Sequence, residues 1–284
     1  MCRQLHMAPS TYYAHAAIKH NLDLRSNRSK QDEQLCEHIM RIWHDNYCVY
    51  GVRKVWHSLV NEGVKVARCT VERLMKCLGL EGIRRGKRVK TTLAANAILA
   101  IGDKVKREFS ASKPNAVWVA DFTYVSTWQG FAYVAFIVDL YARRIVGWRV
   151  SNHMRAQFVL DALEQALCQR RPLDNGLTHH SDRGSQYTSI SYTQRLIDAG
   201  IEPSVGKTGS AYDNALAESI NGLYKTELTE RQGWKSIAQL ELATLEWVHW
   251  FNHQRILSSI GYLCPAKAEK LYYDQFHQGA KRAA

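Results

Sequence analysis

The feature that most constrains the fold of this chain is a change in hydrophobic periodicity at Pro114. Before it, between Asp32 and Leu78, apolar residues recur every three or four positions, as on amphipathic helices. After it come three segments rich in valine, isoleucine and aromatic residues, at 115–126, 130–141 and 143–151. Short turns separate these segments, which predicts an antiparallel meander of three strands.

The elements after the meander predict an α/β fold. The pattern indicates a helix at 156–169, a short strand at 176–180, a helix at about 189–199, a brief strand at 201–205, and further helices. Three antiparallel strands followed by alternating helices and strands is the element order of a ribonuclease H-like core. We therefore expect a mixed five-stranded sheet with flanking helices, preceded by a helical domain.

The helical domain contains three apolar clusters that predict three short helices. The clusters are Leu35, Ile39 and Ile42; Val52, Val55, Trp56 and Leu59; and Val71, Leu74, Met75 and Leu78. The breaks at 46–51 and 61–67 are short enough to fold the last two helices into a helix-turn-helix. The third helix would expose Arg68, Glu72, Arg73 and Lys76, although Ala67 offers no capping side chain at its start.

The net charge of +12 is concentrated in the N-terminal part of the chain. Residues 1–110 hold 20 Lys and Arg against 10 Asp and Glu, whereas residues 111–284 hold 18 against 16. A basic module beside a nearly neutral remainder indicates a polyanion partner, with DNA as the first candidate and an anionic membrane surface as the second. The membrane is the weaker candidate, because no segment approaches the ~20 consecutive apolar residues of a span.

Twelve side chains are candidates for contacts with DNA. The basic run GIRRGKRVK at 82–90 has little to bury, and it is equally well explained as a phosphate-binding linker or as solvated surface. For Lys207, in the glycine-containing segment 206–212, contact with a phosphate and plain solvent exposure are equally good explanations. The candidates are Arg53, Lys54, Arg68, Arg73, Lys76, Arg84, Arg85, Lys87, Arg88, Lys207, Asn214 and Lys225.

The cysteines and the N-terminus predict a protein of the cytoplasm. Seven scattered cysteines, none in a C-x-x-C pair, fit reduced thiols in a reducing compartment. The first residues, MCRQLHMAPSTYY, lack the apolar stretch of a secretory signal.

Asp121 is the first residue that suggests catalysis. It lies within a predicted strand whose neighbours on both faces are apolar or aromatic. A buried carboxylate costs several kcal/mol unless it is paired or bound to a cation. The alternatives are an ion pair with an arginine and a position at a sheet edge that faces water.

Two further carboxylates lie where they can join Asp121. Asp182, in HHSDRGSQYTS, follows a short strand, and ligands gather at the carboxyl ends of strands in such sheets. Its alternative is a turn in which the carboxylate binds its own backbone. Glu218 belongs to a predicted helix that is capped near Asp213, where Leu216, Ile220, Leu223 and Leu228 form the apolar stripe. Glu218 shares the other face with Asn214, Asn221 and Lys225, and this face is equally explained as solvent-exposed surface.

Together, the three carboxylates predict a site for two divalent cations. Two aspartates on neighbouring strands and a glutamate on a nearby helix can converge on ions ~3.5 to 4 Å apart. Ligands that are all oxygens select Mg²⁺, with Mn²⁺ as a substitute, over zinc. Such a pair serves in-line displacement at phosphorus, which needs no nucleophilic side chain.

Other polar and aromatic residues have structural explanations. Asp139, at a strand end before a turn, is expected to bind backbone rather than metal. His179 and His180 are expected to be hydrogen-bonded neighbours of the sheet, and neither forms a zinc pattern with the cysteines. The eight tryptophans are assigned to cores.

The order of these motifs resembles a known enzyme family. Asp121 in WVADFTYV, Asp182 in HSDRGSQYTS and Glu218 in DNALAES, with 35 residues between the last two, resemble the acidic triad of DDE transposases and retroviral-type integrases. The flanking words look like the second-frame product of the bacterial insertion-sequence-three family. The resemblance covers nearly the whole chain, including the tail at 247–269.

The resemblance implies a ribonuclease H-like core, two Mg²⁺ ions, and a reaction that cuts the ends of a mobile element and joins them to target DNA. It also implies an oligomer of this chain on double-stranded DNA, and fusion or association with an upstream-frame product that supplies another DNA-binding domain. One departure is in the tail, where such proteins usually carry a histidine two residues after Arg255 and this chain has Leu257.

Two competing functions remain open at this stage. One is a nuclease of the same fold that hydrolyses nucleic acid without joining strands. The other is a DNA-binding regulator with an inactive core, which Leu257 slightly favours and the three intact carboxylates disfavour. The sequence names neither the terminal repeats nor the target.

The expected domains follow from these patterns. They are a polar segment at 1–30, a helix-turn-helix-like domain at 31–80, a basic linker at 81–112, a catalytic core at 113–232 and a helical tail at 233–284.

Overall fold

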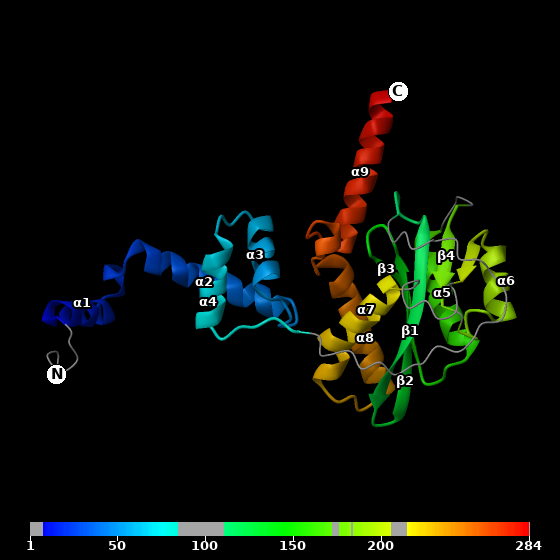
Figure 1. The fold of residues 1–284 in the computed structure, drawn as a ribbon, viewed down its shortest axis with the longest axis horizontal. Helices are drawn as coiled ribbons and strands as arrows, with labels where there is room; N and C mark the ends of the chain where they lie inside the picture. Colours follow the sequence, from blue (N-terminus) through cyan, green and yellow to red (C-terminus); the bar gives the residue numbers. More distant parts are fainter. Residues whose placement is uncertain (1–7, 85–110, 172–175, 183, 206–214, 284) are drawn as a thin grey trace. The chain divides into compact units, whose positions relative to one another are not determined.

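The computed structural model describes residues 8–84, 111–171, 176–182, 184–205 and 215–283 (Figure 1). The chain forms two compact units, Met1–Gly82 and Ile83–Ala284. Among the described residues, no helix combines the length and the apolar character that a membrane crossing requires.

The first unit is entirely helical. Its elements are α1 (Pro9–His20), the 3₁₀ turn η1 (Leu22–Leu24), α2 (Asn27–Asp45), α3 (Val52–Asn61) and α4 (Arg68–Cys77). Helix α1 lies in the polar segment to which the sequence analysis assigned no element, and it buries no residue. Helix α2 begins earlier than Asp32 because Ser26 caps it by accepting a hydrogen bond from the Ser29 N–H at 3.2 Å.

Helices α2, α3 and α4 pack on one another, which confirms the three predicted helices. Their buried residues are Ile39 and Ile42, Val55 and Leu59, and Val71, Leu74 and Met75. The Trp56 indole N–H donates to the Val66 carbonyl at 2.9 Å and fixes the turn between α3 and α4. As expected, Ala67 provides no side-chain cap for α4.

The second unit is built on a five-stranded sheet with the order β3-β2-β1-β4-β5. The strands are β1 (Val117–Thr127), β2 (Gly130–Asp139), β3 (Ile145–Ser151), β4 (Thr178–Ser181) and β5 (Glu202–Val205). Strands β1, β2 and β3 form the predicted antiparallel meander, and β4 and β5 add in parallel to β1. This mixed sheet with helices on both faces confirms the ribonuclease H-like fold.

Helices cover both faces of the sheet (Figure 1). Helices α5 (Ala156–Arg170) and α6 (Ile190–Asp198) bury one face through a core that includes Trp118, Phe158 and Tyr192. Helices α7 (Ala215–Glu227) and α8 (Ile237–His253) lie on the other face, where the rings of Phe136, Tyr224 and Trp247 pack together. The turns η2 (Thr229–Arg231) and η3 (Ser258–Ile260) and the helix α9 (Pro265–Ala283) complete the unit.

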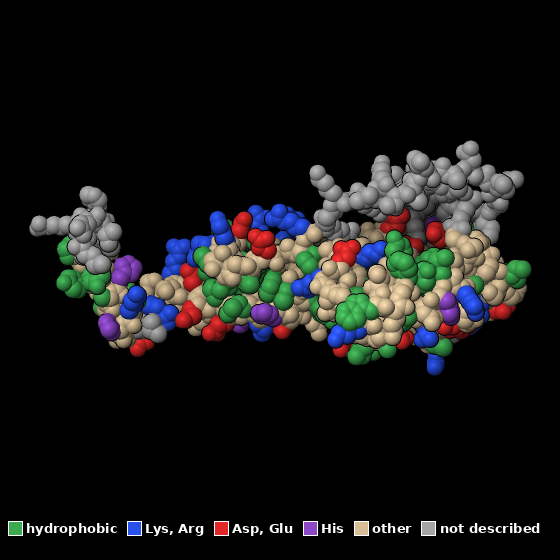
Figure 2. All heavy atoms as spheres, turned by 90° about the horizontal axis from the view of Figure 1, so that it is seen from below, with side chains coloured by type: hydrophobic (Ala, Val, Ile, Leu, Met, Phe, Trp, Pro, Cys, Tyr) green, Lys and Arg blue, Asp and Glu red, His purple; other side chains and the backbone are tan. Residues whose placement is uncertain are grey.

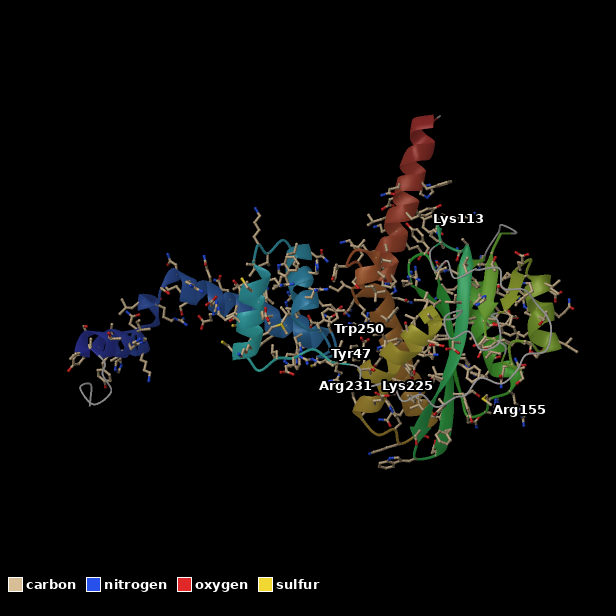
Figure 3. The ribbon with its side chains drawn as sticks, viewed as in Figure 1. Tyr47, Lys113, Arg155, Lys225, Arg231 and Trp250 are labelled. Atoms are coloured by element: carbon tan, nitrogen blue, oxygen red, sulfur yellow. The ribbon has the colours of Figure 1, made fainter. Side chains whose placement is uncertain are left out.

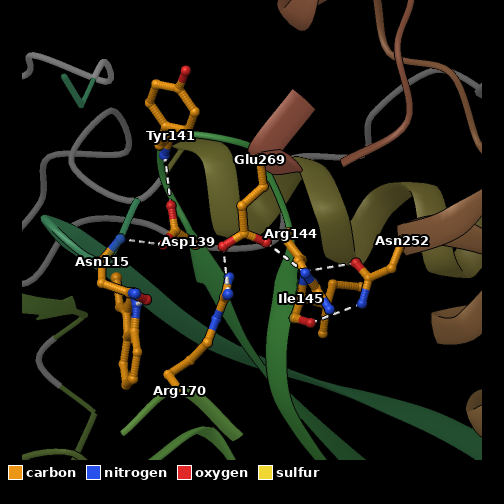
Figure 4. Close-up of polar contacts among 9 residues, drawn as sticks. Asn115, Asp139, Tyr141, Arg144, Ile145, Arg170, Asn252 and Glu269 are labelled. Carbon is orange, nitrogen blue, oxygen red and sulfur yellow. Dashed lines mark hydrogen bonds and ion pairs between the residues drawn. The ribbon is translucent and has the colours of Figure 1, made fainter. Parts of the chain in front are cut away.

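A buried polar network fastens the last helices to the sheet (Figure 4). Glu269 of α9 is buried and pairs with both Arg144 and Arg170. Asn252 of α8 binds the backbone N–H and carbonyl of Ile145, at 2.9 and 2.8 Å. The two helices are therefore joined to the sheet by interactions that leave few buried charges unpaired.

Asp139 has the structural role that its position predicted. Its carboxylate accepts hydrogen bonds from the backbone N–H groups of Asn115 at 2.6 Å and Tyr141 at 2.8 Å. Burial raises its pKa, against the lowering effect of these hydrogen bonds. Asp139 thus holds the turn after β2.

The assignment of all eight tryptophans to cores is wrong for one of them. Trp118, Trp234 and Trp247 are fully buried, whereas the side chain of Trp128, at the tip of the β1–β2 hairpin, is 76% exposed. Trp128 lies in the turn between β1 and β2, outside the buried faces of the sheet.

Gly147 of β3 tests the packing of α5 on the sheet. A Cβ at this position would lie 2.2 Å from the Ala162 carbonyl oxygen. We expect Gly147→Ala to lower the free energy of unfolding by roughly 1–3 kcal/mol, because the helix must move away. Chemical denaturation measures this change. Gly176→Ala is the control, since no atom lies within 4 Å of its added Cβ; equal stability of the two variants would contradict the packing described.

Candidate active site

The pairing of β1 with β4 brings Asp121 and Asp182 together. The last paired residues of the two parallel strands are Ala120 and Ser181. Asp121 and Asp182 are the residues that follow this last pair on β1 and β4. They therefore lie at the same height in the sheet, on strands about 4.8 Å apart. The two aspartates therefore lie side by side where β4 ends and β1 continues.

Asp121 is in an environment that disfavours its charge. Its Oδ1 accepts a hydrogen bond from the Phe122 N–H, and its Oδ2 accepts one from Asn221 Nδ2, both at 2.9 Å. Burial, followed by the charges of Asp182 and Glu218, raises the pKa of Asp121 to about 7. The two hydrogen bonds act in the opposite direction. Among the described residues, Asp121 forms no ion pair with an arginine, which was the alternative left open.

Asp182 has a similar but more open environment. Burial raises its pKa first, and the charge of Glu218 adds to this effect. The backbone N–H of Gly184 donates to Asp182 Oδ1 at 3.0 Å and acts in the opposite direction. The turn interaction that was considered as an alternative is thus present together with the carboxylate neighbours.

Glu218 approaches the aspartates from the first turn of α7. Its charge acts on both Asp121 and Asp182. The structure therefore brings all three predicted carboxylates into one electrostatic cluster, although they are separated by up to 97 positions in the chain.

Helix α7 buries a different face from the one predicted. The stripe of Leu216, Ile220, Leu223 and Leu228 is only partly right, because Leu216 and Leu223 are half-buried. The residues that α7 buries are Ala217, Ile220, Asn221, Tyr224 and Glu227. Polar residues are included because α7 packs against both β1 and α8, where they find partners.

Asn221 is a site residue that the sequence analysis placed on the same helix face as Glu218 but to which it assigned no role. It is buried, and its amide contacts Asp121 one turn after Glu218. The available signal was its spacing: three residues after Glu218, a side chain lies on the same side of a helix. Asn221 thus orients Asp121 from the helix that carries Glu218.

The C-terminal half of α7 is anchored, which fixes the position of Glu218. The Tyr224 hydroxyl shares a hydrogen bond with Thr244 Oγ1 of α8 at 2.6 Å. Glu227 forms a buried ion pair with Arg255, whose guanidinium also lies over the ring of Phe251 at 5.4 Å. These contacts hold the helix against the core without using any carboxylate of the site.

The donor set fits divalent cations, but the side chains do not yet enclose one. Among the described residues, no three His, Cys, Asp or Glu side chains form a ready metal-binding group. Two buried polar atoms beside the aspartates, the Tyr187 hydroxyl and Asn221 Oδ1, have no partner in the described part of the chain. Oxygen ligands, mutual repulsion and these two groups suit a hydrated divalent cation.

The neighbouring histidines are structural, as predicted. The ring of His179 is hydrogen-bonded to the Tyr192 hydroxyl at 3.0 Å, and that of His180 to Ser204 Oγ at 2.9 Å. Burial lowers the pKa of His179 to about 3, so this ring is neutral and supplies no charge to the site.

The described candidates for DNA contact differ in what they touch. In the first unit, Arg53, Arg68, Lys76 and Arg84 are exposed. Lys54 lies over the Tyr50 ring at 4.8 Å, and Arg73 donates to both carboxylate oxygens of Asp32, at 2.8 and 2.9 Å. In the second unit, Lys225 extends from α7 and lies over the Tyr124 ring at 4.7 Å (Figure 3). The candidates outside the described residues are Arg85, Lys87, Arg88, Lys207 and Asn214.

Leu257 occupies a structural position. It is buried, and its backbone N–H donates to the Leu263 carbonyl at 3.0 Å. The Tyr262 N–H in turn donates to the Leu257 carbonyl at 2.9 Å. An apolar side chain thus closes the loop that follows Arg255.

Known families match both units. A family described as an HTH-like domain matches residues 30–88, and two described as an integrase core domain match residues 111–211 and 199–265. Among solved structures, the catalytic core domain of BIV integrase is 21% identical with a TM-score of 0.43, over 58% of this chain and 99% of that one. The magnesium complex of the HTLV-2 integrase catalytic core is 14% identical with a TM-score of 0.41, over 56% and 98%.

Curated relatives extend over nearly the entire chain. The transposase for insertion sequence element IS629 of Shigella sonnei is 57% identical over 273 residues, which cover 96% of this chain and 91% of the relative. The putative transposase for IS986/IS6110 of Mycobacterium tuberculosis is 55% identical over 274 residues, with coverages of 95% and 97%. From this identity, and from the matches of both units, it follows that the chain belongs to the insertion-sequence-three family of DDE transposases and is an enzyme of the polynucleotidyl transferase type.

Proposed function

We propose that this transposase cuts DNA at the ends of its element and joins the freed 3′-hydroxyl to target DNA, in a Mg²⁺-dependent reaction that Mn²⁺ also supports. The catalytic carboxylates are Asp121, Asp182 and Glu218. The observation that carries the proposal is their convergence where β4 ends beside β1. In the first step water attacks the phosphodiester and the 3′-oxygen leaves. In the second step this 3′-hydroxyl attacks a target phosphodiester and displaces its 3′-oxygen.

The three carboxylates would hold two Mg²⁺ ions. When bound, such ions activate an attacking oxygen and stabilise the leaving oxygen of an in-line displacement. Asp121 and Asp182 offer oxygens from the sheet, and Glu218 offers its own from α7. Asn221 fixes the carboxylate plane of Asp121 through its amide N–H.

The tyrosines near the site are unsuited to covalent catalysis. Burial raises the pKa of Tyr187 well above its usual value, and burial also raises the pKa of Tyr192. Both hydroxyls therefore keep their protons at neutral pH. We assign the attacking oxygens to water and to the 3′-hydroxyl of DNA, in a reaction without a protein–DNA covalent intermediate.

The helical unit would bind double-stranded DNA at the terminal repeats through α4 and the basic residues near it. Arg53, Arg68, Lys76 and Arg84 are exposed there. Further parts of the proposal are an oligomer of this chain on DNA, cooperation with an upstream-frame product, and a location at the bacterial nucleoid.

Asp182→Asn and Glu218→Gln test the catalytic roles. Each is expected to reduce Mg²⁺-dependent joining of labelled element-end oligonucleotides by at least about 100-fold, because a metal ligand loses its charge while the fold is kept. Gel analysis of joined and cleaved strands measures this, and DNA binding should change less than about twofold.

Asp198→Asn and Glu246→Gln are matched controls, since both acids are exposed on helices of the same unit. Normal joining by Asp182→Asn or Glu218→Gln would refute the assignment. Cleavage by the wild-type protein without any joined product would indicate a nuclease, and DNA binding without any Mg²⁺-dependent product would indicate a regulator.

Asp121→Asn tests the electrostatic state of the site. In the metal-free protein the folded state keeps a proton on Asp121 up to about pH 7, whereas the unfolded chain releases it near pH 4. Stability should therefore fall as the pH rises from about 4 to about 7. Asp121→Asn has no carboxyl group to titrate at this position. We therefore expect its free energy of unfolding to exceed that of the wild type by roughly 1–3 kcal/mol at pH 8 in EDTA.

Denaturation of both proteins at pH 5 and pH 8 measures this difference. At pH 8, Mg²⁺ should raise the melting temperature of the wild type and leave that of Asp121→Asn nearly unchanged. Identical pH dependence of the two proteins would exclude the raised pKa as an influence on stability.

The salt dependence of DNA binding tests the helical unit. Replacing Arg53, Arg68 and Lys76 by alanine should lower the slope of log affinity against log salt concentration by about 3, since each phosphate contact contributes about 1. Fluorescence anisotropy with a duplex probe gives this slope. Glu72→Gln, on the same helix, should strengthen binding without reducing the slope, and a wild-type slope in the triple variant would contradict the proposed surface.

A further inference from the structure

The β1–β2 hairpin carries an exposed aromatic surface that the proposed function does not use. This hairpin surface consists of Tyr124, Trp128 and Phe131, with exposed fractions of 60%, 76% and 57%. Figure 2 views the molecule from the side on which the hairpin ends, and it shows hydrophobic side chains next to Lys and Arg side chains there. Exposed aromatic residues that are grouped in this way indicate a binding site.

The two faces of the hairpin are unequal. Thr123, Val125 and Thr127 of β1 are buried on one face. Tyr124 lies on the opposite face, and so does Phe131, which pairs with Ser126 across the hairpin. On that face Tyr133 still packs near Phe158 of α5, with ring centroids 6.4 Å apart, but the residues closer to the tip extend beyond the helix.

The hairpin tip is held rigidly. The Trp128 N–H donates to the carbonyl of Trp234, a fully buried residue, at 2.9 Å. Thr127 Oγ1 donates to the Gly130 carbonyl at 2.7 Å, and Gly130 has a φ of +109°, which favours glycine. The aromatic rings are thus presented on a fixed scaffold, which lowers the entropy cost of binding.

Two lysines stand over the exposed rings. Lys225 Nζ lies 4.7 Å from the Tyr124 ring centroid, and Lys235 Nζ lies 5.9 Å from that of Trp128. Protein interfaces are depleted of lysine in their centres. Aromatic rings interleaved with cations are instead the arrangement that binds unpaired nucleotides, whose bases stack on the rings while phosphates meet the cations.

The hairpin leads from the proposed active site to Trp128. Trp128 follows Asp121 by seven residues, which is about 23 Å along the hairpin at about 3.3 Å per residue. Asp121 contacts α7, and Trp128 contacts the segment before α8, whereas Tyr124 and Phe131 lie on the face of the sheet that α5 covers. A strand that leaves the site along the hairpin would reach the Trp128 ring.

We propose that the hairpin surface binds unpaired nucleotides of the DNA strand next to the scissile phosphodiester, with a base stacked on Trp128 and a phosphate near Lys235. Duplex DNA is a poorer fit, because its bases are already stacked on each other. The assignment to the strand at the scissile position rests on the proposed function, whereas the binding of unpaired nucleotides is tested without catalysis.

The test uses the full chain in EDTA with a fluorescein-labelled 20-nucleotide oligothymidylate and a blunt 20-base-pair duplex. Trp128→Ala should weaken oligothymidylate binding between about 5- and 100-fold, the range for loss of one stacking ring. Its affinity for the duplex should stay within about twofold, and Trp128→Phe should retain most of the affinity for oligothymidylate. Ile190→Ala is the control, since this side chain is 88% exposed on α6 away from the hairpin.

Wild-type affinity of Trp128→Ala for oligothymidylate would overturn the proposal. If this variant also has a smaller molecular mass in solution than the wild type, the hairpin surface is instead a contact between protein copies. A wild-type protein that binds oligothymidylate through Trp128 but joins no strands in Mg²⁺ would reject the proposed function alone.

Discussion

The parallel pairing of β1 with β4 is the constraint on which the site depends. It ends at Ala120 and Ser181, and so it delivers two aspartates to the same level of the sheet. Their repulsion, added to burial, is what raises the pKa of Asp121. A fold that places like charges close together stores unfavourable energy, which a divalent ion can release on binding. The pairing of the strands thus favours the binding of a metal ion through repulsion between the carboxylates, before the side chains have the geometry of a complete metal site.

Helix α7 completes the site because its far end is immobilised. The Tyr224–Thr244 hydrogen bond and the Glu227–Arg255 pair join it to α8 and the following loop. Glu218 and Asn221 lie closer to the start of the helix, where they face the aspartates. Residues far from the chemistry, such as Arg255, therefore determine where the third carboxylate stands.

Much of this architecture could be predicted from the sequence. The change of period at Pro114 predicted the meander, and the order of elements predicted the mixed sheet. The three carboxylates were identified from their motifs, and their spatial convergence agrees with that prediction. Asp139 was correctly separated from them because a carboxylate before a turn usually binds backbone.

Other features depend on tertiary contacts that a linear pattern does not encode. Helix α1 buries nothing, so it has no apolar stripe that would have revealed it. Asn221 looked like a surface residue because its partner, Asp121, lies 100 positions earlier. Leu216 and Leu223 suggested a buried stripe, but α7 packs on two sides and buries polar residues that find partners there.

The buried Glu269 has a consequence for how the chain becomes a folded enzyme. Arg144 follows β2 and Arg170 ends α5, but both pair with Glu269, which is synthesised about 100 residues or more after them. Until Glu269 has been synthesised, the partly folded sheet holds two guanidinium groups without the carboxylate that pairs with them. A chain that ended before Pro265 would keep every proposed catalytic carboxylate but would lack the acid that pairs with Arg144 and Arg170, so its fold would be less stable.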